Sequence, residues 1–279
     1  MRRTTTGDLR ELKTRGVPIV MVTAYDFNSA SVAEAAGVDV VLVGDSAAMT
    51  MLGYASTRLV SLDEMLMLTR AVRRGLTHPL LVGDLPFGSY EQSDDQAMET
   101  AARFVDAGCD AVKLEGGSDA MVDRVRALIA AGIPVMGHVG LTPQSTGEGE
   151  GFHVHGRTAD DALQILREAT ALEGAGCFAV VFEAIPAPVT ALLVPRLDVP
   201  IIGIGAGGAT DGQVLVFDDL VGLFAGRAPK FVKRFAEVRA EMLSAVERYA
   251  GEVRTGSFPD VAHGYGLDAA ELDRLRTLL

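Results

Sequence analysis

Cysteine and long apolar runs are both scarce in this sequence. Cys109 and Cys177 are the only cysteines among its 279 residues, too few for a disulfide framework or a four-cysteine zinc site. No apolar run approaches the ~18 residues that a membrane span requires, because glycine, proline or a charged residue interrupts each one. Residues 1–6 include two arginines but no apolar segment, so we expect no secretory signal. These absences predict a cytoplasmic protein.

Basic residues are in the minority, since 25 Lys and Arg side chains stand against 37 Asp and Glu side chains and leave a formal net charge of −12. Such a charge repels phosphate backbones and anionic lipid, so we expect neither nucleic acid nor a membrane surface as a partner. In contrast, 48% of the residues are hydrophobic and the mean hydropathy is +0.25, which is enough to form a sizeable core. Because no linker or low-complexity stretch divides the chain, we predict a single domain over residues 1–279.

Three segments repeat one order of features. Each contains a helical end, a glycine that would stop the helix, a mostly apolar run and then an acid, and they are residues 32–46 (VAEAAGVDVVLVGDS), 104–117 (FVDAGCDAVKLEGG) and 172–186 (LEGAGCFAVVFEAIP). Four further apolar runs, each with a proline near its start, are at residues 18–25, 79–84, 133–138 and 200–205, and a weaker eighth run is at residues 220–224. Short apolar runs without polar alternation are typical of strands buried on both faces, which indicates a parallel sheet.

Helix signals lie between these runs. The pairs Ser31/Glu34, Ser61/Glu64 and Ser93/Gln96 have the spacing of a capping box. Glycines stand where the helices should end, at Gly37, Gly75, Gly108, Gly132 and Gly176. A strand followed by a helix, repeated about eight times, predicts an α/β fold of the (β/α)8 TIM-barrel type, with a doubly wound open sheet as the alternative. We expect extra C-terminal helices over residues 231–250 and 267–279.

Ionisable side chains stand at the ends of five predicted strands: Asp45, Asp84, Glu115, His138 and Glu183. Side chains alternate between the two faces of a strand, so each of these should share a face with the residue two positions earlier. Those earlier residues are Val43, Val82, Lys113, Met136 and Val181. Catalytic groups of a barrel come from the C-terminal ends of its strands. We therefore expect four carboxylates, one lysine and one histidine to converge at one mouth.

A single acid at a strand end can simply cap the next helix or be solvated. Four acids that follow apolar strands are costly to bury together unless a cation or a substrate compensates their charge. Oxygen ligands without a nearby cysteine favour a hard divalent cation, Mg²⁺ in the first place. Lys113, one of only four lysines, lies within an apolar strand and could form a Schiff base or hold a substrate carboxylate. The expected metal favours the second role.

Three further patterns are weaker. Residues 203–208 match G-x-G-x-x-G, but late in the chain and outside a first βαβ unit, so an anion site after the seventh strand or a tight turn is preferred to a dinucleotide site. His153 and His155 have the spacing of a zinc pair, yet they lie in a glycine-rich loop. Cys109 and Cys177 precede predicted buried strands and are interpreted as small core residues.

Several longer motifs are spread over nearly the whole chain. They are TAYD at residues 23–26, VGDS at 43–46, AVRRG at 71–75, DLPF at 84–87, VKLEGG at 112–117, GHVGLTPQS at 137–145, GIGAG with TDGQVLV within 203–216, and PKFVKRF at 229–235. VKLEGG and GHVGLTPQS together are the specific ones. With these motifs the sequence resembles the ketopantoate hydroxymethyltransferase family, within the phosphoenolpyruvate/pyruvate barrel superfamily.

This resemblance implies a Mg²⁺-dependent enzyme of pantothenate biosynthesis with a (β/α)8 barrel, usually a homo-oligomer of ten subunits. Such an enzyme transfers a hydroxymethyl group from the co-substrate 5,10-methylenetetrahydrofolate to 3-methyl-2-oxobutanoate and yields 2-dehydropantoate through an enolate. At matching positions the resemblance implies roles for the following residues: Asp45, Asp84 and Glu115 as the metal cluster, Asp45, Ser46, Asp84 and Lys113 at the oxo acid, Glu183 as the proton acceptor and His138 as an active-site histidine.

The chain departs from the usual family pattern at a few loop positions: Ala47, Ala48, Ala55, Arg58 and His155. We expect these positions in or near the loops over the mouth. They leave open a relative that hydroxymethylates a different 2-oxo acid. A Mg²⁺-dependent C–C lyase of the same superfamily and a binding or scaffold protein that kept the fold are also open at this point.

Overall fold

The computed structural model describes residues 2–145, 153–226 and 228–279. Its centre is a closed barrel of eight parallel strands in sequential order, in which β1 also pairs with β8. The predicted TIM-barrel class is confirmed, and the open sheet is excluded. The strands are β1 Ile19–Thr23, β2 Val40–Val43, β3 Leu80–Asp84, β4 Ala111–Lys113, β5 Val135–Gly140, β6 Ala179–Glu183, β7 Ile201–Ile204 and β8 Gly212–Leu215.

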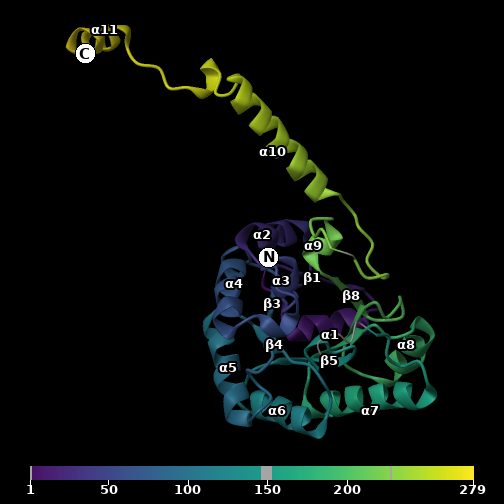
Figure 1. Ribbon diagram of the computed structural model, residues 1–279. Coiled ribbons are helices and arrows are strands. Elements are labelled where there is room, and N and C mark those ends of the chain that lie inside the picture. The colour runs from purple at the N-terminus through teal and green to yellow at the C-terminus, as the bar shows by residue number, and fades with distance from the viewer. Residues whose placement is uncertain (1, 146–152, 227) are drawn as a thin grey trace.

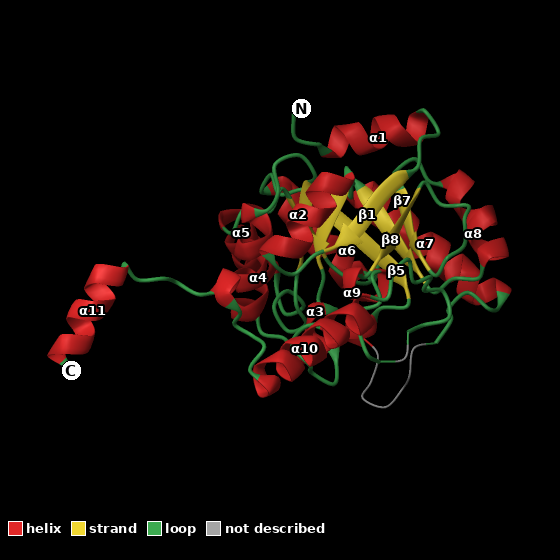
Figure 2. Cartoon of the chain, turned by 90° about the horizontal axis from the view of Figure 1, so that it is seen from above, coloured by secondary structure: helices red, strands yellow, loops and turns green. Residues whose placement is uncertain are grey.

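The inside of the barrel is filled by apolar side chains from all eight strands. They form one cluster with Ile19, Met21, Val40, Leu42, Leu80, Val82, Ala111, Met136, Ala179, Val181, Ile202 and Val214. Leu9 of α1 (Thr6–Thr14) is fully buried and belongs to the same cluster. Since α1 precedes β1, it closes the N-terminal end of the barrel and leaves the other end for a site (Figure 2).

A second apolar layer lies between the barrel and its outer helices. Outward side chains such as Val41 and Val112 pack there against helix residues such as Leu66 and Phe104. This layer explains why the strands have few polar positions, because both of their faces are covered. The outer helices are α2 Phe27–Ala36, α4 Leu62–Arg74, α5 Asp94–Asp106, α6 Asp119–Ala130, α7 Ala159–Ala175 and α8 Ala187–Leu193.

Two of the three predicted capping boxes need correction. Ser61 and Glu64 form the predicted box at the start of α4. Ser93 accepts from the backbone N–H of Gln96, but the Gln96 amide oxygen accepts from Gln92 instead, so only half of that box exists. The prediction for Ser31 is wrong.

Helix α2 begins earlier than predicted, because Asp26 is its N-cap and forms a capping box with Ser29. Ser31 therefore lies inside the helix, where its hydroxyl donates to the carbonyl of Phe27. Glu34 accepts instead from the backbone N–H groups of Thr77 and His78, which ties α2 to the turn before β3.

The eighth strand was predicted in the wrong place. It is β8, which follows β7 after the described loop 205–211, a loop of bends without a helix. Residues 220–224, predicted as that strand, instead complete the short helix α9 (Phe217–Leu220) and the turn after it. Backbone N–H groups of Leu223 and Phe224 both bond to the carbonyl of Asp218, which stabilises this turn.

The chain ends in two helices outside the barrel, α10 (Val238–Thr255) and α11 (Ala269–Leu278). Figure 1 shows both extending away from the barrel as an arm. The predicted start of the first helix at residue 231 is wrong, since residues 231–237 form a loop. None of the residues of α10 and α11, all of them described, is buried. Among the described helices, none is long and apolar enough to cross a membrane.

Candidate active site

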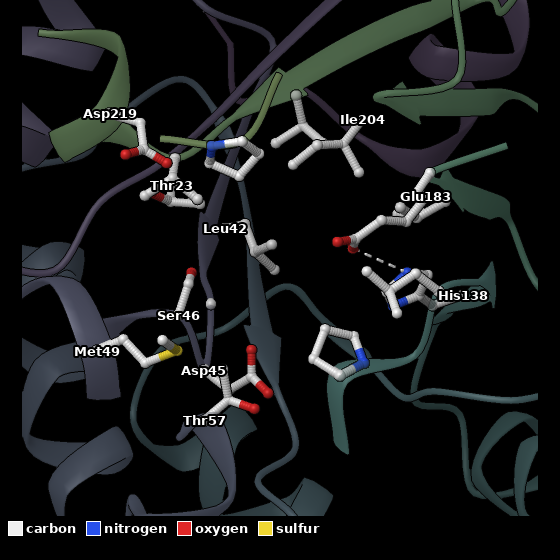
Figure 3. A pocket seen from close by; sticks show the side chains of 18 of the residues that line it. Thr23, Leu42, Asp45, Ser46, Met49, Thr57, His138, Glu183, Ile204 and Asp219 are labelled. Atoms are coloured by element: carbon white, nitrogen blue, oxygen red, sulfur yellow. Dashed lines mark ion pairs between the residues drawn. The ribbon is translucent and has the colours of Figure 1, made fainter. Parts of the chain in front are cut away.

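A cavity of about 820 Å³ opens at the C-terminal ends of the strands. The short helix α3 (Ala47–Thr50) follows β2 beside it. The predicted side chains all line this cavity: Asp45, Ser46, Asp84, Lys113, Glu115, His138 and Glu183. Figure 3 shows Asp45, Ser46, His138 and Glu183 from close by. The predicted convergence at one mouth is therefore confirmed.

Lys113 and Asp84 form the closest ion pair of the site. The ammonium Nζ of Lys113 donates to both carboxylate oxygens of Asp84, at 2.7 and 2.9 Å, and lies 3.8 Å from Oε1 of Glu115. Burial opposes the charge on Lys113, but the carboxylates around it outweigh burial and raise its pKa. Lys113 is therefore a buried ammonium group, and the charge it supplies compensates part of the acidic cluster.

Asp45 reaches the cavity by a route that strand alternation does not predict. Val43, expected on the same face, points outward into the layer under the helices, whereas Val40 and Leu42 point inward. The strand ends at Val43, and the turn into α3 rotates Asp45 into the cavity, where its backbone N–H donates to Oδ2 of Asp84 at 3.3 Å. For Asp84, Lys113, His138 and Glu183 the predicted inward face is confirmed by their inward neighbours Val82, Ala111, Met136 and Val181.

The pKa of Asp45 reflects the repulsion between the buried carboxylates of the cavity. Burial, together with repulsion from Asp84 and Glu115, raises the pKa of Asp45 to about 8. Burial also raises the pKa of Asp84, although Lys113 works in the opposite direction. A bound cation would relieve this repulsion.

His138 lies between two carboxylates. Its Nδ1 is 3.3 Å from Oε1 of Glu115, and its Nε2 is 3.2 Å from Oε2 of Glu183. Both nitrogens are buried and face a carboxylate oxygen, so the two acids favour the charged form of the ring. Burial and Lys113 oppose a charged ring, but Glu115 and Glu183 raise the pKa of His138 to about 9.

The backbone after Glu183 is also constrained. Ala184 has a φ of 50°, the only positive φ outside glycine among the described residues. Its N–H donates to the carbonyl of Ile204 and its carbonyl accepts from the N–H of His155, at 2.9 and 3.0 Å. Such a backbone conformation persists only where the surrounding structure stabilises it. It turns the chain directly after Glu183, whose side chain lines the cavity.

Ser46 stands at the start of α3. Its Oγ lies 2.8 Å from the phenol oxygen of Tyr25, which is almost fully buried. Burial raises the pKa of Tyr25, so the phenol keeps its proton and can donate to Ser46. This contact orients the serine hydroxyl at the cavity wall.

Three buried polar residues at this end of the barrel were not predicted. Gln144 donates from Nε2 to Asp45 Oδ2 and from its backbone N–H to Glu115 Oε2, both at 3.0 Å, and accepts from Tyr90 Oη at 2.7 Å. Asp219, which lines the cavity, has an Oδ1 atom without a hydrogen-bond partner among the described residues. Gln144 lies within the GLTPQS motif, which was the available signal, whereas Tyr90 and Asp219 have no such context.

The donor set suits a Mg²⁺ ion held by few protein ligands. Within residues 2–145, 153–226 and 228–279, no three His, Cys, Asp or Glu side chains are arranged to hold a metal ion. Asp45 and Asp84 are linked through the Asp45 backbone N–H, while Glu115 is engaged by His138 and Gln144. Mg²⁺ is usually bound through one or two carboxylates and keeps waters or substrate oxygens, which two aspartates can satisfy.

The three weaker sequence patterns, the two histidines, the two cysteines and the glycine-rich segment 203–208, are not part of the acidic cluster. The zinc interpretation of His153 and His155 gains no support, because these residues line two different cavities and no described group of three ligands exists. Much of the loop before His153 lies outside the described residues. Cys109 and Cys177 are free and buried, as predicted. Residues 203–208 form the end of β7 and the bend before β8.

The positions that depart from the family pattern do not contact the main cavity. Ala47, Ala48, Ala55 and Arg58 are absent from its described lining, and His155 lines the second cavity. The Arg58 guanidinium stacks on the ring of Phe87 with 3.9 Å to the centroid. Ala47 and Ala48 are fully buried behind the lining.

Comparison with known proteins gives consistent matches along the chain. The family model described as ketopantoate hydroxymethyltransferase matches residues 3–261. A protein of Oleidesulfovibrio alaskensis named 3-methyl-2-oxobutanoate hydroxymethyltransferase is 52% identical over 275 residues, which is 98% of this chain and 94% of that protein. A rice protein named 3-methyl-2-oxobutanoate hydroxymethyltransferase 1, mitochondrial, is 49% identical over 98% of this chain and 77% of its own length.

Solved structures share the architecture at much lower identity. Phosphonopyruvate hydrolase in complex with oxalate and Mg²⁺ has a TM-score of 0.61 at 15% identity and covers 99% of this chain and 98% of its own. For 2,3-dimethylmalate lyase the TM-score is 0.59 at 16% identity, with 98% and 99% of the two chains covered. These two likenesses concern the fold alone. The family match and the close relatives show that the chain belongs to the ketopantoate hydroxymethyltransferase family.

Proposed function

We propose that this protein transfers a hydroxymethyl group from 5,10-methylenetetrahydrofolate to 3-methyl-2-oxobutanoate and yields 2-dehydropantoate for pantothenate biosynthesis. Membership of the family and the names of the relatives support this assignment. The observation that carries it is the acidic wall of the cavity, where buried carboxylates, Lys113 and His138 meet beside Glu183. Such a wall suits the removal of a proton next to a ketone.

Asp45 and Asp84 are the residues that would hold Mg²⁺, and the raised pKa of Asp45 reflects a repulsion that a cation relieves. Glu115 remains a candidate third ligand. When bound, Mg²⁺ polarises the ketone and stabilises the negative charge that develops on its oxygen. The buried ammonium group of Lys113 keeps Asp84 in place and adds positive charge for an anionic substrate.

Glu183 accepts the C3 proton of the oxo acid. Its carboxylate lies at the cavity, where Oε2 is 3.2 Å from Nε2 of the charged ring of His138. As the C3–H bond breaks, its electron pair forms the enolate. Water replaces both nitrogens on the methylene carbon of the donor, so that tetrahydrofolate leaves with one proton on each of these nitrogens and the carbon is released as formaldehyde. C3 bonds to this carbon while one bond of its C=O group breaks, and the oxygen, which came from water, takes the proton back from Glu183 and becomes the hydroxyl group of the product. Ser46 and Lys113 bind the substrate carboxylate.

The positions of the residues that depart from the family pattern support 3-methyl-2-oxobutanoate as the substrate rather than another 2-oxo acid. None of them is among the described residues that line the main cavity, so none is placed to contact the substituents at C3 directly. Within this proposal the reaction takes place in the cytoplasm, in keeping with two free buried cysteines.

We further propose that the working form is a homo-oligomer built from copies of this one catalytic domain. Helix α10 presents exposed apolar side chains at spacings of four, three and four residues, which places them on one face: Met242, Val246, Tyr249 and Val253. An exposed apolar stripe of this kind marks an interaction site. A second copy of the chain is the partner this proposal commits to.

The decisive experiment follows deuterium exchange at C3 of 3-methyl-2-oxobutanoate in D₂O by NMR. We expect exchange with Mg²⁺, none after chelation with EDTA, and product formation only when 5,10-methylenetetrahydrofolate is added. Exchange at full rate in metal-free buffer would contradict the metal role. Absence of both exchange and product would support a scaffold, and cleavage of a C–C bond would support a lyase.

A further inference from the structure

The main cavity is larger than a five-carbon oxo acid needs. Cavities of about 300–1,000 Å³ commonly hold a drug-sized ligand, and this one measures about 820 Å³. The acids and His138 occupy one part of its wall. A different set of side chains lines the part formed by β8, α9 and the segment after them: Val216, Asp219, Phe224, Pro229, Lys230 and Phe231.

Asp219 is the unusual member of this second wall. It is only 8% exposed, and its Oδ1 atom has no hydrogen-bond partner among the described residues. Figure 3 shows Asp219 and Glu183 on opposite sides of the view, with Leu42 between them. A buried acceptor without a partner is destabilising, so a ligand with N–H donors at this place would stabilise it. Burial also raises the pKa of Asp219, and Arg234 offsets this only in part.

Other side chains of this second wall suit a flat ring with an anionic extension. Phe231 packs against Gly205, where a Cβ atom would come within 2.5 Å of the ring. The phenylalanine thus lies against the end of β7, at the edge of the cavity. Lys230 also lines the cavity, and Lys233 and Arg234 follow it. Three basic residues within residues 229–235 stand out in a chain with a net charge of −12.

We propose that Asp219 binds the amino-pyrimidinone edge of the donor's reduced pterin ring, with Phe231 beside the ring and Lys230 toward the anionic glutamate tail. This inference rests on the proposed function, since it takes methylenetetrahydrofolate as the donor. The ring N3–H and the adjacent 2-amino group present two parallel N–H donors. Two carboxylate oxygens match such a pair, as they match a guanidinium group. The donor would then approach from the side opposite Glu183.

The test measures tetrahydrofolate binding to the full-length, Mg²⁺-loaded protein by isothermal titration calorimetry. Asp219→Asn keeps the shape but turns one acceptor into an N–H group, so we expect affinity to fall about 10- to 100-fold. Asp218→Asn is the matched control, because Asp218 is a neighbouring buried acid outside the described cavity lining. We expect it to bind tetrahydrofolate like the parent. In steady-state assays Asp219→Asn should raise the KM for the donor far more than the KM for the oxo acid.

Fragments of the donor separate the two halves of the proposed site. Asp219→Asn should weaken 6-methyltetrahydropterin and leave p-aminobenzoylglutamate unaffected, whereas Lys230→Ala should do the reverse. Equal affinity of parent and Asp219→Asn for tetrahydrofolate and the pterin fragment would overturn the inference and leave the proposed function intact. A parent that exchanges C3 deuterium but does not bind tetrahydrofolate would overturn both the inference and the proposed donor. A parent that binds tetrahydrofolate without exchange would contradict only the proposed acceptor chemistry.

Discussion

The ammonium Nζ of Lys113 lies 2.7 and 2.9 Å from the two carboxylate oxygens of Asp84, and both side chains are buried. This two-pronged contact explains how a lysine is retained inside an apolar barrel. It also fixes the chemical state of the lysine, because the surrounding carboxylates raise its pKa against the effect of burial. A protonated amine cannot attack a ketone.

The first prediction is that Lys113 forms no Schiff base. Incubation with 3-methyl-2-oxobutanoate and borohydride should leave the parent protein without a covalent adduct in intact-mass spectra, because the amine is held as an ammonium ion by Asp84. An aldolase known to act through a Schiff base, treated in parallel, shows that trapping works. An adduct located on Lys113 would contradict the proposal that Lys113 acts only through its positive charge.

The second prediction concerns the stability of the same pair in metal-free buffer. Removal of one partner of a buried ion pair leaves an uncompensated charge and typically costs about 3–5 kcal/mol. Lys113→Met should therefore lower the free energy of urea unfolding by about that amount, and Lys113→Met with Asp84→Asn should recover a clear part of the loss. If the double variant is no more stable than Lys113→Met, the pair does not act as a unit.

Much of this arrangement could be predicted from the sequence because parallel strands buried on both faces appear in it as short apolar runs. Asp84, Lys113, His138 and Glu183 continue the alternation of apolar strands, so both their face and their meeting point follow from position. Asp45 converges for a different reason, since the turn after Val43 rotates it inward. Alternation cannot describe a residue that lies beyond the end of its strand.

The remaining differences also have local causes. Strand β8 begins with a glycine and has one exposed position, whereas residues 220–224 form a more apolar run. Hydrophobicity along the sequence therefore favours residues 220–224 as the eighth strand. Gln144 could not be placed because its role depends on four partners from distant parts of the chain: Asp45, Leu85, Tyr90 and Glu115. Contacts of this kind carry no periodic signal along the sequence.

The third prediction is a pH dependence of stability due to His138. The pKa of its ring is raised to about 9 in the folded protein, above the ordinary value of 6.5. The proton therefore stabilises the fold fully below pH ~6.5, and this contribution is lost as the pH rises through about 9. In metal-free buffer, the unfolding free energy of the parent minus that of His138→Gln should fall by on the order of 3 kcal/mol across this window. Gln164→Leu, on the exposed surface of α7, changes no titratable group and should show no such window.

The fourth prediction tests the arm as an interface. Val246 is 63% exposed on the apolar stripe of α10, so Val246→Glu places a charge where we expect a second copy to pack. We expect a smaller assembly in analytical ultracentrifugation, with unchanged far-UV circular dichroism. Glu247→Gln changes a residue outside the stripe and should leave the assembly as it is. A parent protein that is already monomeric at micromolar concentration would contradict the proposal.

The last prediction concerns Glu183 as the proton acceptor. Its Oε2 lies 3.2 Å from Nε2 of His138, and it follows Val181, whose side chain points into the barrel. General-base assistance typically contributes about 10²–10⁴-fold, so Glu183→Gln should slow C3 deuterium exchange by that factor. Glutamine keeps the size of the side chain but cannot accept the proton. The rate is measured at saturating oxo acid and Mg²⁺, so that a change in binding does not enter it.

A structural role for Glu183 predicts a different outcome, because the strained Ala184 follows it directly. If Glu183 only supports this turn, Glu183→Gln should lower the melting temperature or weaken substrate binding and leave the exchange rate at saturation intact. Gln164→Leu, on the exposed surface of α7, serves as a control for general effects of substitution. Exchange at the parental rate in Glu183→Gln would transfer the base role to a bound water or to His138, and the second of these requires a deprotonated ring. The rate would then increase with pH as the ring loses its proton, at a pKa below that of the parent because the contribution of Glu183 is absent.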